Sequence, residues 1–333
     1  MKLKLSNKHI AILMPIVALM FVMCSGSKKI DSKKESDLTK KGLVGDVKSV
    51  RIINYEAVDN FGKIEKGEPK SVGGYMTYKG FWTLPIANYM EFDRDGNKTV
   101  EASYTYSGSL HRKWIYSYDD KGRRTERNAF DANASHLLKW IYKYDAKGNI
   151  IESNIYKTNG SLSSKETYKY DNVGNLIEEN QYKADGSLDA KEVYKYDNNR
   201  NRIETVKYDS NLKVANKVLF KYDNKGREIE ETKHWLDGSI SDIYTYKYDN
   251  RGNLAEYINS DDDGDISDRE TYKHDDRGNL IEKNGFDWDD LTNPAYSTTY
   301  EYVYDQKGNW IKMTVFENGM PEYIQERTIE YHS

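Results

Sequence analysis

An acidic stretch from Asn259 to Glu270 is the first segment whose residue types could do chemistry, because clustered carboxylates are ligands that Ca²⁺ prefers. Several of its residues fall at the spacing of a twelve-residue calcium loop. The candidate ligands are Asp261, Asp263, Asp265 and Glu270. An Asp-Gly pair within the stretch also predicts a tight hairpin turn, and a two-residue turn cannot wrap a cation. We therefore expect neither a bound metal nor a cofactor.

Glutamates that recur at a fixed interval could supply paired carboxylates for acid–base catalysis. They are Glu126, Glu152, Glu178, Glu204, Glu230, Glu256 and Glu282. An active site needs one specific arrangement of residues, whereas a repeat places the same glutamate at many equivalent positions. This series therefore predicts a ladder of charged residues on the surface. The 6 histidines are scattered and no nucleophile or phosphate-binding motif occurs. We expect a protein without enzyme activity. The alternative, an envelope glycan hydrolase, requires singular carboxylates clustered in a deep pocket on the concave face.

Aromatic residues make binding the favoured class of function. Two sets of three lie one interval apart, and exposed rings of this kind would suit recognition of a glycan or a peptide. The candidate ligand-binding residues are Trp114, Tyr116, Tyr118, Trp140, Tyr142 and Tyr144. The competing interpretation is that these rings pack inside a curled sheet, because a sheet of one layer must bury one face.

A repeat of 26 residues organises the chain that carries these side chains. Aromatic-Asp pairs recur from Phe92-Asp93 to His274-Asp275, and Tyr304-Asp305 follows after an insertion near Trp288 to Pro294. Asp-x-x-Gly turns alternate with Asn-Gly or Asp-Gly turns, and both favour hairpins. The excess of tyrosine, 29 against 8 phenylalanines, also favours strands. Only Arg200 replaces the glycine of the first turn, so we expect backbone strain there.

The predicted fold is all-β. It is a long antiparallel meander of about nine 26-residue hairpin repeats, strongly twisted or curled into an open solenoid or partial shell, with an atypical N-terminal cap. Alternation places Tyr168 and Tyr170 on the concave face, and two-residue turns would add Ile177 to them. Glu178 with Lys169 and Lys191 then forms a charged ladder that faces solvent.

The string Tyr-x-Tyr-Asp-x-x-Gly-Asn-Leu/Ile, as in Tyr168 to Ile177, resembles the YD repeats of the Rhs family over roughly residues 90–310. In that family repeated hairpins build a sheet that spirals into a hollow shell around a carried toxin. The resemblance is closer to small bacterial lipoproteins of unknown function that use the same repeat. It implies a scaffold or, as a further alternative, an Rhs-like encapsulating shell fragment.

The amino terminus predicts export. Lysines precede an uncharged run from Ile10 to Met23, which is long enough for a signal peptide core. The only cysteine, Cys24, closes this run and resembles the lipobox cysteine that becomes lipidated in bacterial lipoproteins. With Ser25 after the cysteine, the resemblance implies an anchor in the outer membrane with the chain on its periplasmic side. Residues 43–333 hold 41 Lys and Arg against 51 Asp and Glu, a net charge of −10, which argues against a nucleic acid partner.

The sequence therefore divides into five parts. Residues 1–24 are the lipoprotein-type signal, 25–42 a flexible Lys/Ser linker, 43–90 the N-terminal β cap, 91–308 the hairpin repeats and 309–333 a closing hairpin. We expect a non-catalytic cell-envelope lipoprotein that acts as a β-repeat scaffold or binding module. Its partners would be the membrane, through the lipid anchor, and a protein or polysaccharide ligand.

Overall fold

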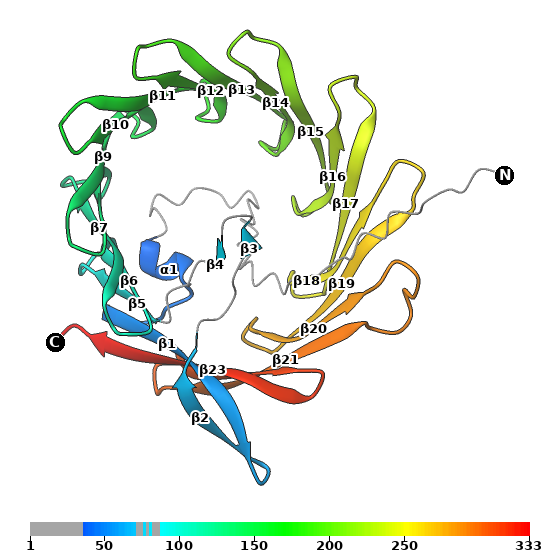
Figure 1. Ribbon diagram of the computed structural model, residues 1–333. Coiled ribbons are helices and arrows are strands. Elements are labelled where there is room, and N and C mark those ends of the chain that lie inside the picture. Colours follow the sequence, from blue (N-terminus) through cyan, green and yellow to red (C-terminus); the bar gives the residue numbers. More distant parts are fainter. Residues whose placement is uncertain (1–35, 71–75, 78–79, 82–86) are drawn as a thin grey trace.

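The structure is a computed structural model that describes residues 36–70, 76–77, 80–81 and 87–333 (Figure 1). Most of these residues lie in antiparallel strands. The elements are α1 (Asp37–Lys40), β1 (Val47–Asn60), β2 (Lys63–Pro69), β3 (Met76–Thr77), β4 (Gly80–Phe81), β5 (Ala87–Phe92), β6 (Lys98–Tyr104), β7 (Leu110–Tyr118), β8 (Arg124–Phe130), β9 (His136–Tyr144), β10 (Ile150–Lys157), β11 (Leu162–Tyr170), β12 (Leu176–Lys183), β13 (Leu188–Tyr196), β14 (Arg202–Tyr208), β15 (Val214–Tyr222), β16 (Glu228–His234), β17 (Ile240–Tyr248), β18 (Leu254–Ser260), β19 (Ile266–His274), β20 (Leu280–Phe286), β21 (Tyr296–Tyr304), β22 (Trp310–Glu317) and β23 (Met320–Tyr331).

The sheet closes on itself, so the expected open solenoid or partial shell is wrong. Strands β5 to β23 each pair with the next, and β1 pairs with β5 on one edge and with β23 on the other. Within the described residues the result is a closed barrel of 20 antiparallel strands. Val50 illustrates the closure, because it faces Met90 of β5 and Ile329 of β23. Closure satisfies the backbone groups that an open sheet would leave bare at its two edges.

The segment expected to cap the sheet supplies the closing strand instead. The first half of β1 completes the barrel, whereas its second half leaves β5 and forms a hairpin with β2. Figure 1 shows this hairpin projecting from the wall of the barrel. At the other end of the chain, β22 and β23 form the hairpin expected around Asn318-Gly319, and β23 pairs with β1.

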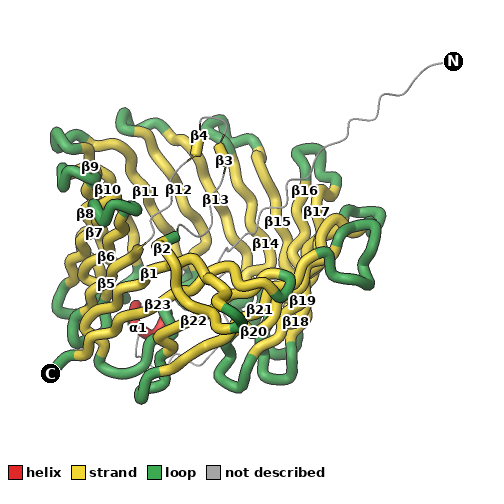
Figure 2. Tube along the Cα trace, turned by 60° about the horizontal axis from the view of Figure 1, so that its bottom comes forward, coloured by secondary structure: helices red, strands yellow, loops and turns green. Residues whose placement is uncertain are grey.

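Two sets of turns define the two rims of the barrel (Figure 2). The Asp-turn rim holds the nine turns at 93–96, 119–122, 145–148, 171–174, 197–200, 223–226, 249–252, 275–278 and 305–308; the second rim holds the others between paired strands. In one example the amide of Gly148 donates to the carbonyl of Asp145 at 3.1 Å. The Asp145 carboxylate accepts the amide of Asn149 at 2.8 Å. Each aspartate thus caps its own turn.

The turns are longer than two residues, and this changes one predicted face. Pairing skips Ile151 between Ile150 and Glu152, which marks a β-bulge. The same shift omits Ile177, so that Leu176 rather than Ile177 lies opposite Tyr170. The isoleucine position therefore leaves the tyrosine face, and Ile151 is 39% exposed.

Part of the excess of tyrosine is explained by these bulges. In successive repeats the hydroxyl of the second tyrosine donates to a carbonyl on the preceding, adjacent strand, at the residue beside the bulge. These bonds join Tyr118 to Lys98 (2.7 Å), Tyr144 to Arg124 (2.6 Å), Tyr170 to Ile150 (2.9 Å), Tyr196 to Leu176 (2.8 Å), Tyr222 to Arg202 (2.8 Å) and Tyr248 to Glu228 (2.7 Å). A bulge disrupts the ladder locally, and the phenol provides a partner that phenylalanine could not.

Replacing Tyr170 by phenylalanine is accordingly expected to lower the free energy of unfolding by about 1 kcal/mol, because the carbonyl of Ile150 loses its donor. Urea unfolding of the two proteins measures the difference. Tyr182→Phe is the matched control, since Tyr182 lies opposite Lys165 on the other face of the sheet. Equal losses for both variants would contradict this role of the hydroxyl.

The expected strain at Arg200 is confirmed. Its φ is +69°, in the left-handed region that the equivalent Gly174 occupies at +93°. Arg200→Gly is expected to stabilise the protein by about 0.5–1 kcal/mol, since relief of the strain exceeds the entropy cost of glycine. Gly174→Arg has open space around it and should destabilise by about 1 kcal/mol. Urea midpoints that move in the same direction for the two variants would contradict this assignment.

The tyrosine face forms the inner wall of the barrel. Figure 1 shows α1 inside the ring of strands. The hydroxyl of Tyr118 shares its one hydrogen between the Lys98 carbonyl at 2.7 Å and the carboxylate of Asp37 in α1 at 3.0 Å. Leu38 and Leu43 pack with Val50, Met90 and other apolar residues into one buried cluster. Residues 36–42, which the sequence assigns to a flexible linker, thus lie against the inner wall. Burial opposes ionisation of Asp37, but bonds from the Lys98 amide and Tyr118 outweigh it and lower the pKa of this carboxyl.

The outer wall carries the predicted charged ladder. The carboxylate of Glu178 pairs with Lys169 at 2.6 Å and with Lys191 at 2.9 Å. The same pattern recurs at Glu152 and Glu204 in the neighbouring repeats. The ladder interpretation of the recurring glutamates is therefore confirmed.

Candidate functional site

The six aromatic residues predicted to bind a ligand lie on the inner wall, on β7 and β9 with β8 between them. Arg127 of β8 faces Trp140 on one side and Tyr116 on the other. Its guanidinium lies 4.5 Å from the ring of Trp140 and 5.9 Å from that of Trp114. Arg112 lies 5.9 Å from the Trp114 ring. We call Arg112, Trp114, Arg127 and Trp140 the tryptophan–arginine platform.

Tyr116 and Tyr118 have structural partners that compete with a ligand. Tyr116 is only 8% exposed, between Lys98 at 5.1 Å and Arg124 at 4.6 Å from its ring. Its hydroxyl donates to Glu101 at 2.9 Å, and burial together with that carboxylate raises its pKa. Tyr118 donates to Asp37, which fixes α1. These two rings hold the wall together.

Of the two tyrosines on β9, Tyr144 also has a structural partner, whereas Tyr142 donates no such bond to the wall within the described residues. Tyr144 donates to the carbonyl of Arg124, and the guanidinium of Arg123 lies 4.8 Å from its ring. Tyr142 is half-buried opposite Ser153 of β10, and burial raises its pKa. Of the predicted set, Trp114, Trp140 and Tyr142 are thus the rings best placed to receive a ligand. Flat rings beside guanidinium groups can stack against a planar or apolar surface and donate hydrogen bonds to oxygen atoms.

A second group of inner-wall residues lies on β19 to β21, around Glu270, which the sequence suggested only as a calcium ligand. The carboxylate of Glu270 forms an ion pair with Lys283 at 2.6 Å. It also accepts hydrogen bonds from the hydroxyl of Tyr296 at 2.8 Å and from that of Tyr272. These donors outweigh burial and lower the pKa of Glu270, whereas burial and the nearby Glu270 charge raise the pKa of Asp268. Two carboxyl groups with opposite shifts are a feature of acid–base pairs.

A departure from the repeat could have signalled this group. Gly285 stands where the preceding repeats have Asn259, Lys233 and Lys207. A Cβ atom at Gly285 would lie 2.1 Å from the ring of Tyr296, so only glycine lets this ring cross the strand. The signal is therefore a glycine at a repeat position where the three preceding repeats have polar side chains.

The calcium candidate is not assembled. Asp261 caps its own turn, accepting the amides of Asp263 at 3.1 Å and Asp265 at 2.9 Å. Glu270 lies farther along β19 with Lys283 as its partner. Among the described residues no group of three or more histidine, cysteine, aspartate or glutamate side chains is arranged to hold a metal ion. The structure therefore gives these four residues different roles.

Cys24, the predicted lipidation site, lies outside the described residues. In the part of the chain that is described, no helix combines the length and the apolar character needed to cross a membrane.

Comparison with known proteins identifies no characterised family. A family model described as "Uncharacterised protein" matches residues 87–216, and no curated protein matches. Among solved structures, TcdB2-TccC3-TEV is 13% identical with a TM-score of 0.30, covering 74% of this chain but only 16% of that one. A porin-like protein from Bacteroides uniformis is 10% identical with a TM-score of 0.32, covering 86% and 98%. One from Bacteroides vulgatus is 12% identical with a TM-score of 0.27 and the same coverage.

The expected membership of the YD-repeat family, in the form of a small lipoprotein, is therefore wrong: the matching family model is that of an uncharacterised family. The Tyr-Asp-x-x-Gly string has a local cause, since aspartate caps the turn and tyrosine reaches the carbonyl beside a bulge. Such strings arise wherever hairpins of this geometry repeat.

Proposed function

We propose that the chain is a non-catalytic binding module of the cell envelope that holds a protein or glycan ligand against the inner wall of its barrel. The tryptophan–arginine platform carries this proposal, because it gathers two indole rings and two guanidinium groups on adjacent strands of one wall. Tryptophan and arginine are the residue types that contribute most to binding energy at interfaces.

The dimensions of the barrel support a ligand inside it. Twenty strands spaced about 4.8 Å apart and tilted enclose a barrel roughly 30–40 Å across at the backbone, and such barrels are too wide for wall side chains to fill. The outer wall, with its paired lysines and glutamates, suits contact with water, whereas lipid-facing strands carry an apolar band. The aromatic wall is thus the one fitted for recognition.

Capture from an envelope extract tests the proposal. Immobilised full-length protein is expected to retain a protein or polysaccharide that the Trp114→Ala/Trp140→Ala variant retains at least tenfold less, because a central aromatic platform contributes more than about 1.4 kcal/mol. Trp235→Ala is the matched control, since Trp235 is 64% exposed in a turn of the second rim. Retention that is equal in all three proteins, or absent in the parent, would contradict a binding role for the platform.

The second candidate function is the envelope glycan hydrolase, and the opposite pKa shifts of Asp268 and Glu270 are the observation that favours it. In that reading Asp268 is the acid and Glu270 the base. The lysine and two tyrosines that bind Glu270 favour a structural network instead. Release of reducing ends from envelope glycan, lost in both Asp268→Asn and Glu270→Gln, would establish the hydrolase and displace the binding proposal.

The proposed location is the periplasmic side of the outer membrane, through a lipid on Cys24. The lipobox-like sequence around Cys24 and the preceding uncharged run support it. A palmitate analogue should label the parent protein and leave Cys24→Ala unlabelled. Equal labelling of the two proteins would contradict the anchor.

A further inference from the structure

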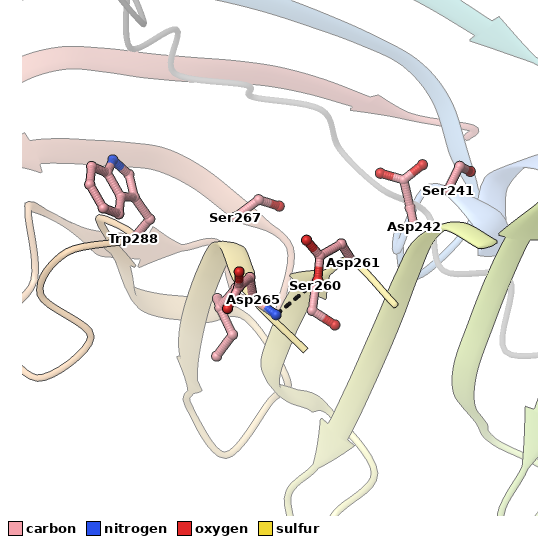
Figure 3. A pocket seen from close by; sticks show the side chains of 8 residues that line it. Ser241, Asp242, Ser260, Asp261, Asp265, Ser267 and Trp288 are labelled. Atoms are coloured by element: carbon pink, nitrogen blue, oxygen red, sulfur yellow. Dashed lines mark hydrogen bonds between the residues drawn. The ribbon is translucent and has the colours of Figure 1, made fainter. Parts of the chain in front are cut away.

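A pocket of about 400 Å³ opens at the second rim, apart from the platform. It is formed by the start of β17, the turn between β18 and β19, and the insertion after β20. Its lining includes Ser241, Asp242, Ser260, Asp261, Asp265 and Trp288. Figure 3 shows Trp288 at one end and Ser241 with Asp242 at the other, with the turn residues between them.

The residues that line the pocket depart from the pattern of the preceding repeat. Trp288 lies in the insertion that lengthens the last interval between aromatic-Asp pairs, and its side chain is 74% exposed. Asp242 and Asp265 stand where the preceding repeat has Asn216 and Ser239. The exposed indole supplied by the insertion therefore lines one pocket with Asp242 and Asp265.

The polar groups of the pocket are fixed in position but largely unused. Asp261 is held by the amides of Asp263 and Asp265, and the hydroxyl of Ser267 donates to the carbonyl of Asn259 at 3.3 Å. Within the described residues, the side chains of Ser241, Asp242, Ser260 and Asp265 make no hydrogen bond or ion pair. Other wall carboxylates do have such partners, as Glu270 has Lys283 and Glu178 has Lys169.

We propose that this pocket binds one sugar ring of a carbohydrate. A pyranose has an apolar face of C–H groups that can stack on the exposed indole of Trp288, and hydroxyls around its edge. The carboxylates of Asp242 and Asp265 accept hydrogen bonds from those hydroxyls, and Ser241 and Ser260 both donate and accept. Three carboxylates in the lining repel phosphorylated or sulfated ligands, so the sugar carries no anionic group. This site is separate from the platform, and neither depends on the other.

Calorimetric titration of the full chain with cellobiose, maltose and chitobiose tests the proposal. At least one disaccharide is expected to bind, with its Kd raised at least tenfold in Trp288→Ala and in Asp242→Asn. The Kd should be unchanged in Trp235→Ala, whose indole lies in a neighbouring turn. The same variants are also titrated in the Trp114→Ala/Trp140→Ala background, which removes the platform, so that binding there reports the rim pocket alone and failure of one proposal is distinguishable from failure of the other.

Three results would overturn the proposal. The first is the absence of binding by all three disaccharides. The second is binding that persists in Trp288→Ala. The third is binding of trilysine or of CaCl₂ alone at this pocket, abolished in Asp242→Asn, without sugar binding; it would make the pocket a site for cations. Trp288 and Asp242 are not part of the buried cluster, and an unchanged thermal midpoint confirms that each variant is folded.

Discussion

Truncation of Leu38 to alanine is expected to release the segment that lies against the inner wall. Leu38 is 8% exposed and packs in the cluster with Val50, Met90 and Phe92. Removing a buried leucine side chain costs about 2–4 kcal/mol, which is large for a segment of one helical turn. The loss should appear as local opening, because β1 to β23 keep their own pairing.

Hydrogen exchange measures this loss directly. The amide of Leu38 donates to the carbonyl of Gly96 at 3.0 Å, and that of Val44 donates to the Asn309 side chain at 2.7 Å. Both amides should lose protection by a factor of about 30 or more in Leu38→Ala, the fold-change that corresponds to about 2 kcal/mol. Lys40→Ala is the control, since Lys40 is exposed. Unchanged protection in Leu38→Ala would show that the segment does not depend on this contact.

Replacement of Glu228 by glutamine is expected to stabilise the protein at alkaline pH only. Burial and the neighbouring charge of Glu231 raise the pKa of Glu228 from 4.5 to about 7, against the opposing effect of Arg202. Between these values the folded protein holds a proton that the unfolded chain has released. The free energy of unfolding therefore falls as pH rises through this window. Above pH 7 Glu228 is ionised in the folded protein as well, and its full destabilising effect is present.

The expected gain for Glu228→Gln is about 2 kcal/mol at pH 8 and close to zero at pH 4, after allowing for partial solvent screening. Urea unfolding at the two pH values measures it. Glu230→Gln is the matched control on the outer wall, where Glu230 pairs with Lys221 at 2.7 Å, and it should cost no more than about 1 kcal/mol. A gain for Glu228→Gln that is equal at both pH values would contradict the raised pKa.

The local parts of the fold could be predicted from the sequence. Aspartate and glycine at fixed offsets specify the turns, and alternation of Lys169 with Tyr168 and Tyr170 separates an outer from an inner wall. The turns and the alternation of faces each depend only on residues that are close together in the sequence. The predicted aromatic set likewise lies together, because Trp114 and Trp140 occupy equivalent positions on strands separated by one other.

The remaining features depend on contacts that no local pattern encodes. Closure joins Val50 to Ile329, residues at opposite ends of the sequence, and its occurrence depends on accumulated twist and stagger over the whole sheet. The place of Ile177 was wrong because one bulge reverses the parity of a strand. The network around Glu270 depends on Tyr296, which an insertion brings beside Gly285.

Closure is the claim on which an inner wall, and therefore a ligand inside it, depends. In a Cys24→Ser background, cysteines at Arg51 of β1 and Thr328 of β23 would stand opposite each other on exposed positions. A short bismaleimide is expected to join them within the monomer, whereas it should not join Arg51→Cys to Thr245→Cys on β17. Failure of the first pair to react, or linkage only between two molecules, would contradict the closed barrel.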